Sequence, residues 1–171
     1  MLLKSLQRLL ESKSLDQISV GDITEEATVN RGTFYDHYAD KFALFEGLVE
    51  SGFQELLKNR NMGFDGTCGS VLQGITLTTC DYMVSLMRPD CPERRQMEKH
   101  FELAMVSVIR GMLLCGLQQH PPRNGISAEL VAATVSGAIC SGAREWAHTP
   151  NRGSADEAAK SIFTLIQPML G

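Results

Sequence analysis

Apolar side chains recur three and four residues apart along most of the chain, which is the spacing of helices with one buried face. The first stripe covers residues 2–10, and helix N-caps are expected at Ser19, Asn30 and Asp40. Asp22 stands three residues after Ser19, as in a capping box. No sustained alternation of apolar and polar residues indicates a strand, so the sequence predicts an all-α protein.

A Gly- and Asn-rich segment, residues 61–69, divides the chain into two parts. Before it stand three short helices and one longer helix, whose expected buried residues are Leu44, Phe45, Leu48, Phe53 and Leu56. After it, helical patterns span about residues 70–87, 92–117 and 127–148, and a last helix opens at a capping box at Ser154. We therefore predict one domain over residues 1–60 and a second over residues 61–171.

Composition adds limits to this picture. The 171 residues carry 16 Lys and Arg against 20 Asp and Glu, a formal charge of -4, so any contact with a polyanion needs a local patch. The five Cys residues form no Cys-x-x-Cys pair, which argues against a disulfide framework or a thiolate zinc site and suits the cytoplasm. The start of the chain lacks the continuous apolar core of a signal peptide. The apolar stretch 101–117 is expected to be too short to span a membrane.

Two short helices separated by a tight turn at Thr28 and Val29 form the pattern of a helix-turn-helix. In the second of them, residues 30–38, Phe34 and Tyr38 fall on one stripe that would pack inward. The opposite face is small and rich in hydrogen-bond donors: Gly32, Thr33 and Asp36, flanked by Tyr35 and His37. A helix that enters a major groove end-on needs such a face, because its N-terminal residues meet the duplex.

The run ITEEATVNRGTFYDHYADKFALF, from Ile23 to Phe45, resembles the TetR family of bacterial regulators. It keeps the family pattern Thr-(aromatic or Leu)-Tyr-x-His-(Phe or Tyr), with Lys three residues later. The resemblance covers about residues 2–57 and implies an all-α fold, with an N-terminal three-helix DNA-binding domain and a C-terminal helical bundle that binds a ligand and dimerises. Carried onto this sequence, the family's DNA contacts fall on Thr24, Arg31, Gly32, Thr33, Tyr35, His37 and Lys41.

Four departures from the family pattern bear on this interpretation. Thr28 stands where the family usually has Gly, so the turn either differs or carries strain. Residues 1–60 hold seven Lys or Arg against ten Asp or Glu, a balance of -3, and no basic lead-in precedes the first helix. Asp36 lies on the presumed groove-facing surface. The negative balance, the missing basic lead-in and Asp36 favour the alternative of a TetR-like adaptor that binds a protein partner, whereas the kept Thr33, Tyr35 and Lys41 favour DNA.

Met-rich faces mark two helical patterns of the second half. They are typical of core packing, and they also suit an adaptable cavity for a small apolar effector, which the family resemblance places in this domain. The candidate cavity residues are Cys80, Met83, Met87, Met97, Phe101, Met105 and Met112.

Small residues recur every fourth position on one face of the helix expected at 127–148. Such a face packs closely against a neighbouring helix, either inside the protomer or across an interface. The family resemblance implies a two-fold interface made by the last two helices, with candidate residues Ala133, Gly137, Ser141, Ile162, Phe163, Ile166 and Met169. A dimer suits a palindromic operator with half-sites ~34–36 Å apart, or a multiple of that distance.

No nucleophile motif, zinc-binding His-Glu-x-x-His or phosphate-binding Gly-rich loop occurs, so we expect neither an enzyme nor a bound metal or cofactor. The expectation is a cytoplasmic, homodimeric, one-component transcriptional regulator of double-stranded DNA. By the family's default it is a repressor released by a small-molecule effector.

Overall fold

The computed structural model describes residues 1–60, 69–86, 92–122 and 125–169 of the chain. Throughout these ranges the regular elements are helices, in agreement with the predicted all-α class. They are α1 (Leu2–Leu9), η1 (Leu15–Gln17), α2 (Val20–Ala27), α3 (Arg31–Tyr35), α4 (Lys41–Asn59), α5 (Gly69–Leu86), α6 (Pro92–Gln119), α7 (Ala128–His148), α8 (Ala155–Ile166) and η2 (Gln167–Met169).

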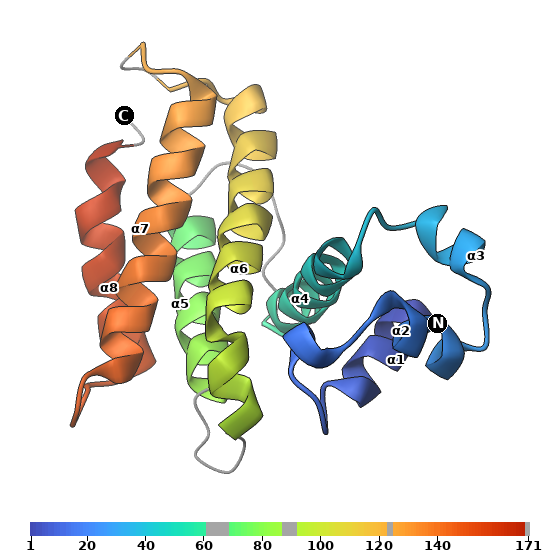
Figure 1. Cartoon of the computed structure of the whole chain (residues 1–171). Coiled ribbons are helices and arrows are strands. Elements are labelled where there is room, and N and C mark those ends of the chain that lie inside the picture. Colours follow the sequence, from blue (N-terminus) through green and yellow to red (C-terminus); the bar gives the residue numbers. More distant parts are fainter. Residues whose placement is uncertain (61–68, 87–91, 123–124, 170–171) are drawn as a thin grey trace.

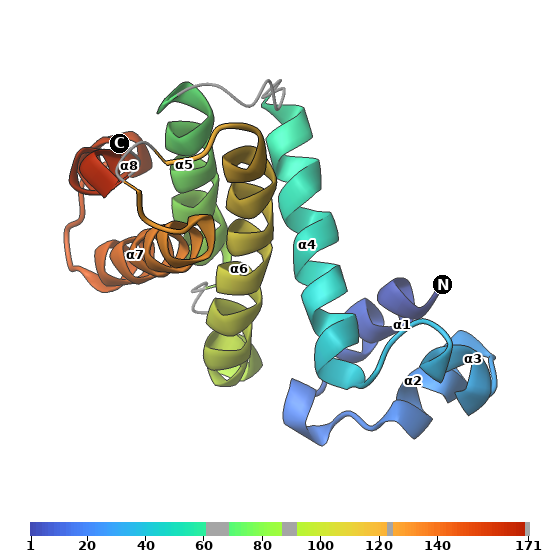
Figure 2. The same cartoon turned by 90° about the horizontal axis from the view of Figure 1, so that it is seen from above.

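The helices form two groups that α4 joins. Figures 1 and 2 show α5, α6, α7 and α8 side by side as a bundle, with α4 alongside α6 and α1–α3 gathered at the far end of α4. Within the first group α1 packs on α2 and α4, and α3 contacts α2. The short helix α3 lies away from the bundle, where a partner can reach it.

The predicted helix starts are confirmed by their caps. The Ser19 hydroxyl accepts from the backbone N–H of Asp22 at 3.1 Å, and the Asp22 carboxylate accepts from the backbone N–H of Ser19 at 2.8 Å. Asn30 Oδ1 accepts from the N–H of Thr33 at 2.8 Å, and the Asp40 carboxylate caps α4. Ser154 forms the predicted capping box with Glu157. These local bonds fix where each helix begins, because they satisfy N–H groups that the helix itself leaves unpaired.

The structure departs from the sequence prediction in three details. The turn η1 was not predicted, although Ser14 and Gln17 form its capping box and Leu15 is fully buried. The helix α3 ends at Tyr35, so Tyr38 packs on Phe34 from the following turn, with ring centroids 6.2 Å apart. On α4 it is Leu57, only 3% exposed, that faces the core, whereas the predicted Leu56 is half-buried.

One continuous apolar core runs through both groups of helices. It includes Phe34 and Phe53 on the N-terminal side and Met105, Ile109 and Ile139 in the bundle, all of them essentially inaccessible to solvent. Because α4 contributes Phe53 to the same core that α6 completes, α1–α3 are tied to the bundle through packed side chains.

Candidate nucleic-acid interface

The turn between α2 and α3 places α3 at the surface. Thr28 has φ 55° and ψ 45°, the left-handed conformation that the sequence prediction associated with strain. The N–H of Val29 donates to the carbonyl of Thr24 and the N–H of Thr28 to that of Glu25, both at 3.0 Å. These two bonds form a Schellman motif, which ends α2 and turns the chain into α3.

The two faces of α3 have opposite roles. Phe34 is 0% exposed and packs edge-to-face with Tyr35, with ring centroids 5.3 Å apart, so it anchors the helix. Tyr35 itself is 57% exposed, and the other outward residues are polar or small: Arg31, Gly32, Asp36 and His37. The outward side of α3 is thus the donor-rich surface that the sequence predicts.

Arg31 supplies positive charge to this surface. Its guanidinium lies over α2, where a methyl group added to Gly21 would come within 3.1 Å of Nη2. Arg31 forms no ion pair with any residue that the structure describes, so its fork of N–H donors is available to a phosphate or a base edge.

Two predicted DNA contacts have hydroxyl groups that are engaged within the protein. Thr24 is only 6% exposed and its hydroxyl donates to the carbonyl of Gly21 at 3.0 Å. The half-buried Thr33 donates from its hydroxyl to the Asn30 cap at 3.2 Å. Thr24 therefore lies behind the exposed surface, whereas Thr33 stays at its edge.

Lys41 has hydrogen-bond partners within the protein that the sequence did not indicate. Its Nζ donates to the carbonyl oxygens of Leu15 at 2.9 Å, Asp16 at 3.1 Å and Ile18 at 2.8 Å. An ammonium group has three N–H donors, so all three are used by the C-terminal end of η1. In this geometry Lys41 holds η1 against the start of α4, and its ammonium is not free for a phosphate.

A contact between η1, α4 and α6 escaped the sequence prediction. His100 of α6 stacks on Phe42 of α4 with ring centroids 5.2 Å apart, and its Nε2 lies 3.1 Å from the Asp16 carboxylate. Asp16 and His100 are 84 positions apart in the chain. No local pattern signals such a pair, because only the packing of α6 beside α4 brings the two together.

Acidic side chains beside α3 are partly neutralised by neighbours. Asp22 pairs with Lys13 at 3.1 Å and Glu26 with Arg8 at 3.3 Å. Hydrogen bonds from the Ser19 hydroxyl and backbone N–H, and then from Lys13, hold the pKa of Asp22 well below its usual range. The carboxylate at the start of α2 is thus ionised at neutral pH and serves the fold.

The predicted effector cavity is largely filled by core packing. Cys80, Met83, Phe101 and Met105 are at most 2% exposed and belong to the continuous core, and Met112 is half-buried against it. The side chains of Met87 and Met97 lie outside the described residues. Cys80 and Cys140 are free and buried, and burial raises the pKa of each thiol to about 12.

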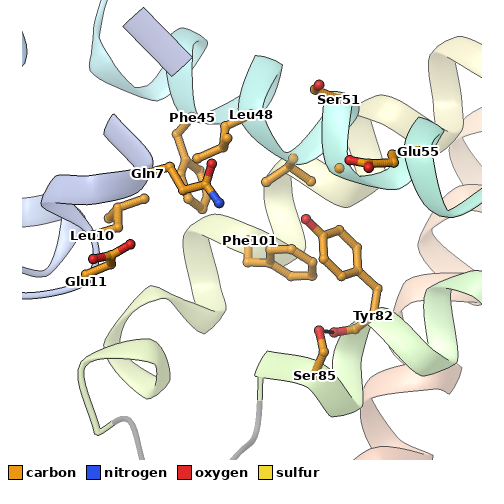
Figure 3. A pocket seen from close by; sticks show the side chains of 12 residues that line it. Gln7, Leu10, Glu11, Phe45, Leu48, Ser51, Glu55, Tyr82, Ser85 and Phe101 are labelled. Atoms are coloured by element: carbon orange, nitrogen blue, oxygen red, sulfur yellow. Dashed lines mark hydrogen bonds between the residues drawn. The ribbon is translucent and has the colours of Figure 1, made fainter. Parts of the chain in front are cut away.

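A cleft lies elsewhere, where α1 and α4 meet α5 and α6. Its volume is about 380 Å³, and of the predicted cavity residues that the structure describes only Phe101 lines it. Figure 3 shows Gln7 of α1, together with Leu10 and Glu11 directly after it, on one side and Ser51, Glu55 and Tyr82 on the other, with Phe101 between them. No local pattern indicates this cleft, since its walls come from four helices.

The predicted dimer residues divide into two sets. Ile162 and Ile166 are 7% and 1% exposed and pack inside the protomer, where Ile162 lies against Gly142, so these two do not form an outward face. Of the other predicted residues, two are exposed, namely Ser141 and Met169, and three are half-buried, namely Ala133, Gly137 and Phe163. A side chain added at Gly137 would meet open space. Leu130 and Leu165, which were not predicted, are 60% and 74% exposed on α7 and α8.

The apolar segment of α6 is longer than the stretch 101–117 that the sequence analysis expected to be too short to span a membrane. Its segment Glu98–Gln119 is long and apolar enough, with a mean hydropathy of 1.5, to meet the length and composition of a membrane span. A core helix meets the same test, and Phe101, Met105 and Ile109 of α6 lie in the core. Among the described residues no group of three His, Cys, Asp or Glu side chains is arranged to hold a metal ion.

The N-terminal helices of this chain are similar to those of known proteins. The family model of bacterial regulatory proteins of the tetR family covers residues 2–48. The HTH-type transcriptional regulator EthR of Mycolicibacterium smegmatis is 36% identical over 70 residues, which cover 41% of this chain and 30% of that protein. DhaS of Lactococcus lactis, an HTH-type dhaKLM operon transcriptional activator, is 33% identical over 58 residues, or 34% and 31% of the two chains. The matches thus span about a third of the length of these relatives.

The fold extends the likeness beyond the first domain. The crystal structure of a TetR transcriptional regulator from Streptococcus agalactiae 2603V superposes over 96% of this chain and 90% of its own, with a TM-score of 0.53 and 22% identity. At that identity the match concerns the arrangement of helices alone. The family model covers α1, α2, α3 and the start of α4, so the helices that build the exposed face of α3 match the tetR family of bacterial regulatory proteins.

Proposed function

We propose that the protein is a cytoplasmic, homodimeric transcriptional regulator that binds a palindromic DNA site through α3 and responds to a small molecule. One observation carries the proposal: the anchored helix α3 turns Arg31, Gly32, Tyr35 and His37 outward at the end of the molecule farthest from the bundle. The matched relatives are named as transcriptional regulators, one of them an activator, which supports regulation in either direction.

The DNA contacts we propose follow from exposure and bonding. Arg31 reads a base edge or phosphate, the Tyr35 hydroxyl donates to a phosphate, and Gly32 lets the duplex backbone approach. Thr33 lies at the edge of this surface, with its hydroxyl held by the Asn30 cap. The N–H groups at the start of α3 favour anions in the same place. Thr24 and Lys41 act indirectly, because their donors hold α2 and η1 in position.

A homodimer through α7 and α8 presents two copies of α3 to one duplex. Leu130 of α7 and Leu165 of α8 are exposed apolar side chains, and the open face of Gly137 allows a helix from a second copy to come close. A two-fold axis at this surface would relate two half-sites ~34–36 Å apart, or a multiple of that distance. A ligand that prefers one separation of the two α3 helices would shift the equilibrium between DNA-bound and free protein.

The test begins with selection of bound sequences from random double-stranded DNA by the full chain. The selected site is then titrated by fluorescence anisotropy at several salt concentrations. We expect a palindromic site, about tenfold weaker binding for Arg31→Ala and a smaller loss for Tyr35→Phe. Lys99→Ala, which removes an exposed charge on α6, serves as the matched control and should bind like the unmodified protein. Failure to enrich any sequence would contradict the proposal.

The alternative is an adaptor that binds a protein partner through the same surface. It is favoured by the engaged ammonium of Lys41 and by the balance of -3 over residues 1–60, both of which reduce attraction to DNA. The salt titration separates the two functions. A DNA-binding regulator loses affinity steeply as salt rises, whereas an adaptor shows no DNA affinity to lose.

A further inference from the structure

One cluster of side chains joins the bundle to the segment that precedes the helix-turn-helix. The helix α6 lies beside α4 (Figure 2), and there the Nε2 atom of His100 lies 3.1 Å from the Asp16 carboxylate of η1. The imidazole also stacks on Phe42 of α4, with ring centroids 5.2 Å apart and planes inclined by 30°. Three elements from different parts of the chain therefore meet at one titratable side chain.

The position of η1 determines where the helix-turn-helix begins. The helix α2 starts three residues after η1 ends, and Ile18 between them is buried. Lys41 holds the backbone of η1 against the start of α4 through three carbonyl groups. His100 adds a second hold, from the bundle to the side chain of Asp16. The strength of that hold therefore bears on how firmly α2 and α3 are fixed to the bundle.

The groups that touch or face His100 respond to its protonation in opposite ways. The Asp16 carboxylate attracts an imidazolium, and so does Phe42, because a cation within ~6 Å of an aromatic centroid is attracted by the ring quadrupole. The Lys41 ammonium, 5.3 Å from the centroid of the same Phe42 ring, opposes the added charge. The carboxylate makes the shortest of these contacts, so protonation strengthens the cluster as a whole. A neutral imidazole shares only a hydrogen bond with Asp16.

The other charged groups on the described parts of α4 and α6 do not reverse this sign. On α4, Asp40 is held at the N-terminal cap, and Glu46, half-buried one turn beyond the stacked phenylalanine, would also favour an imidazolium. On α6, Lys99 is exposed next to the histidine, and Glu102 is paired with Arg144 of α7 at 3.5 Å.

We propose that Asp16 and His100 form a proton-sensitive latch between the helix-turn-helix and the bundle. As pH falls through the range of about 5–8 in which histidine gains a proton, the contact becomes an ion pair and α6 holds η1 more firmly. As pH rises, the hold weakens to a hydrogen bond, and the angle between α3 and the bundle varies more widely. The signal is the proton itself.

The latch has a consequence for DNA that rests on the proposed function, whereas the latch itself does not. Two copies of α3 meet one duplex only at a fixed separation, so their freedom relative to the bundle affects affinity. Between about pH 5.5 and about pH 8 we expect the affinity of the unmodified protein for its DNA site to change about threefold more than that of His100→Phe. An equal pH dependence in the two proteins would contradict this consequence.

The test measures the distance between the helix-turn-helix and the bundle by double electron–electron resonance, in the full chain at about pH 5.5 and about pH 8. Spin labels are carried by p-acetylphenylalanine in place of the exposed Glu25 on α2 and Ser107 on α6, so that the cysteines stay unlabelled. An excess of unlabelled chain restricts the signal to distances within one protomer. We expect a narrower distance distribution at the lower pH. Equal widths at the two pH values would overturn the proposal.

Matched variants assign the response to the latch. His100→Phe keeps an aromatic ring against Phe42 but cannot ionise, and Asp16→Asn keeps the shape of an exposed side chain without its charge. Both should lose the pH response of the distance distribution. His148→Gln is the control, because His148 of α7 forms a comparable pair with Glu98 of α6 at 2.7 Å, within the bundle. A response that both latch variants keep, or that His148→Gln abolishes, would contradict the inference.

The same proteins separate the two proposals. If the distances respond to pH as expected but no DNA is ever selected, the latch stands and the proposed function fails. If the selected DNA binds but the distances do not respond to pH, the latch inference fails and the regulator remains.

Discussion

Thr28 offers a direct measurement of strain in the helix-turn-helix. It is a β-branched residue at φ 55°, its side chain is exposed, and its hydroxyl forms no hydrogen bond with a described residue. The left-handed conformation costs a residue with a Cβ atom about 1–2 kcal/mol. Replacement by glycine removes this cost but gives the unfolded chain more freedom, which returns about 0.4–1 kcal/mol. We therefore expect Thr28→Gly to stabilise the protein by about 1 kcal/mol.

The assay is urea unfolding followed by circular dichroism, with thermal unfolding beside it. A gain of about 1 kcal/mol should raise Tm by about 2–4 °C for a protein of this size. Thr28→Ala keeps the Cβ atom and should leave the free energy of unfolding nearly unchanged. Asn151→Gly is a second control, because Asn151 has φ 53° and asparagine tolerates this region better than threonine. If Thr28→Gly is no more stable than Thr28→Ala, the turn is not strained and the reasoning fails.

Four other predictions rest on contacts and burial described above. Lys41→Met keeps the apolar stem but leaves three carbonyl groups without their donor, so it should lower the free energy of unfolding by about 2 kcal/mol. The salt dependence of DNA binding should stay the same. A salt slope reduced by about one would instead show that Lys41 contacts a phosphate. Leu165→Glu should shift the proposed dimer toward monomer in analytical ultracentrifugation. Leu103→Glu on α6, where the leucine is 63% exposed, is the control and should leave the dimer unchanged. Equal effects of the two variants would show that α8 is not part of the interface. The lowered pKa of Asp22 gives stability that is present above about pH 4 and is lost as pH falls and the group is protonated, so Asp22→Asn should flatten acid unfolding curves. The raised pKa of Cys140 gives stability that is lost as pH rises from 9.0 to about 12, so Cys140→Ala should flatten the alkaline side; unchanged slopes in these two variants would contradict the assignments.

Local chemistry explains which parts of the fold the sequence predicted. The caps at Ser19, Asn30, Asp40 and Ser154 act within three residues, so their patterns are visible in the chain. The outward face of α3 followed from helical spacing in the same way, because Phe34 alone anchors that short helix.

The features that the sequence did not indicate depend on contacts between distant residues. The role of Lys41 is set by carbonyl groups 23 to 26 positions away, and nothing near Lys41 in the sequence indicates them. The Met-rich faces gave no means to separate a cavity from a core, since both are apolar at helical spacing. Ile162 and Ile166 fit an outward interface on periodicity alone, yet they face the protomer's own α5 and α7.

The brevity of α3 has a consequence for how such a protein changes over generations. Its five residues are held by one buried ring and by the caps at its ends, so Arg31, Tyr35 and His37 add little to the stability of the fold. Under the proposed function, substitutions at these three positions would alter which operator is recognised while the scaffold survives. A lineage of this chain could therefore acquire new target genes by few mutations, without first gaining a reserve of stability.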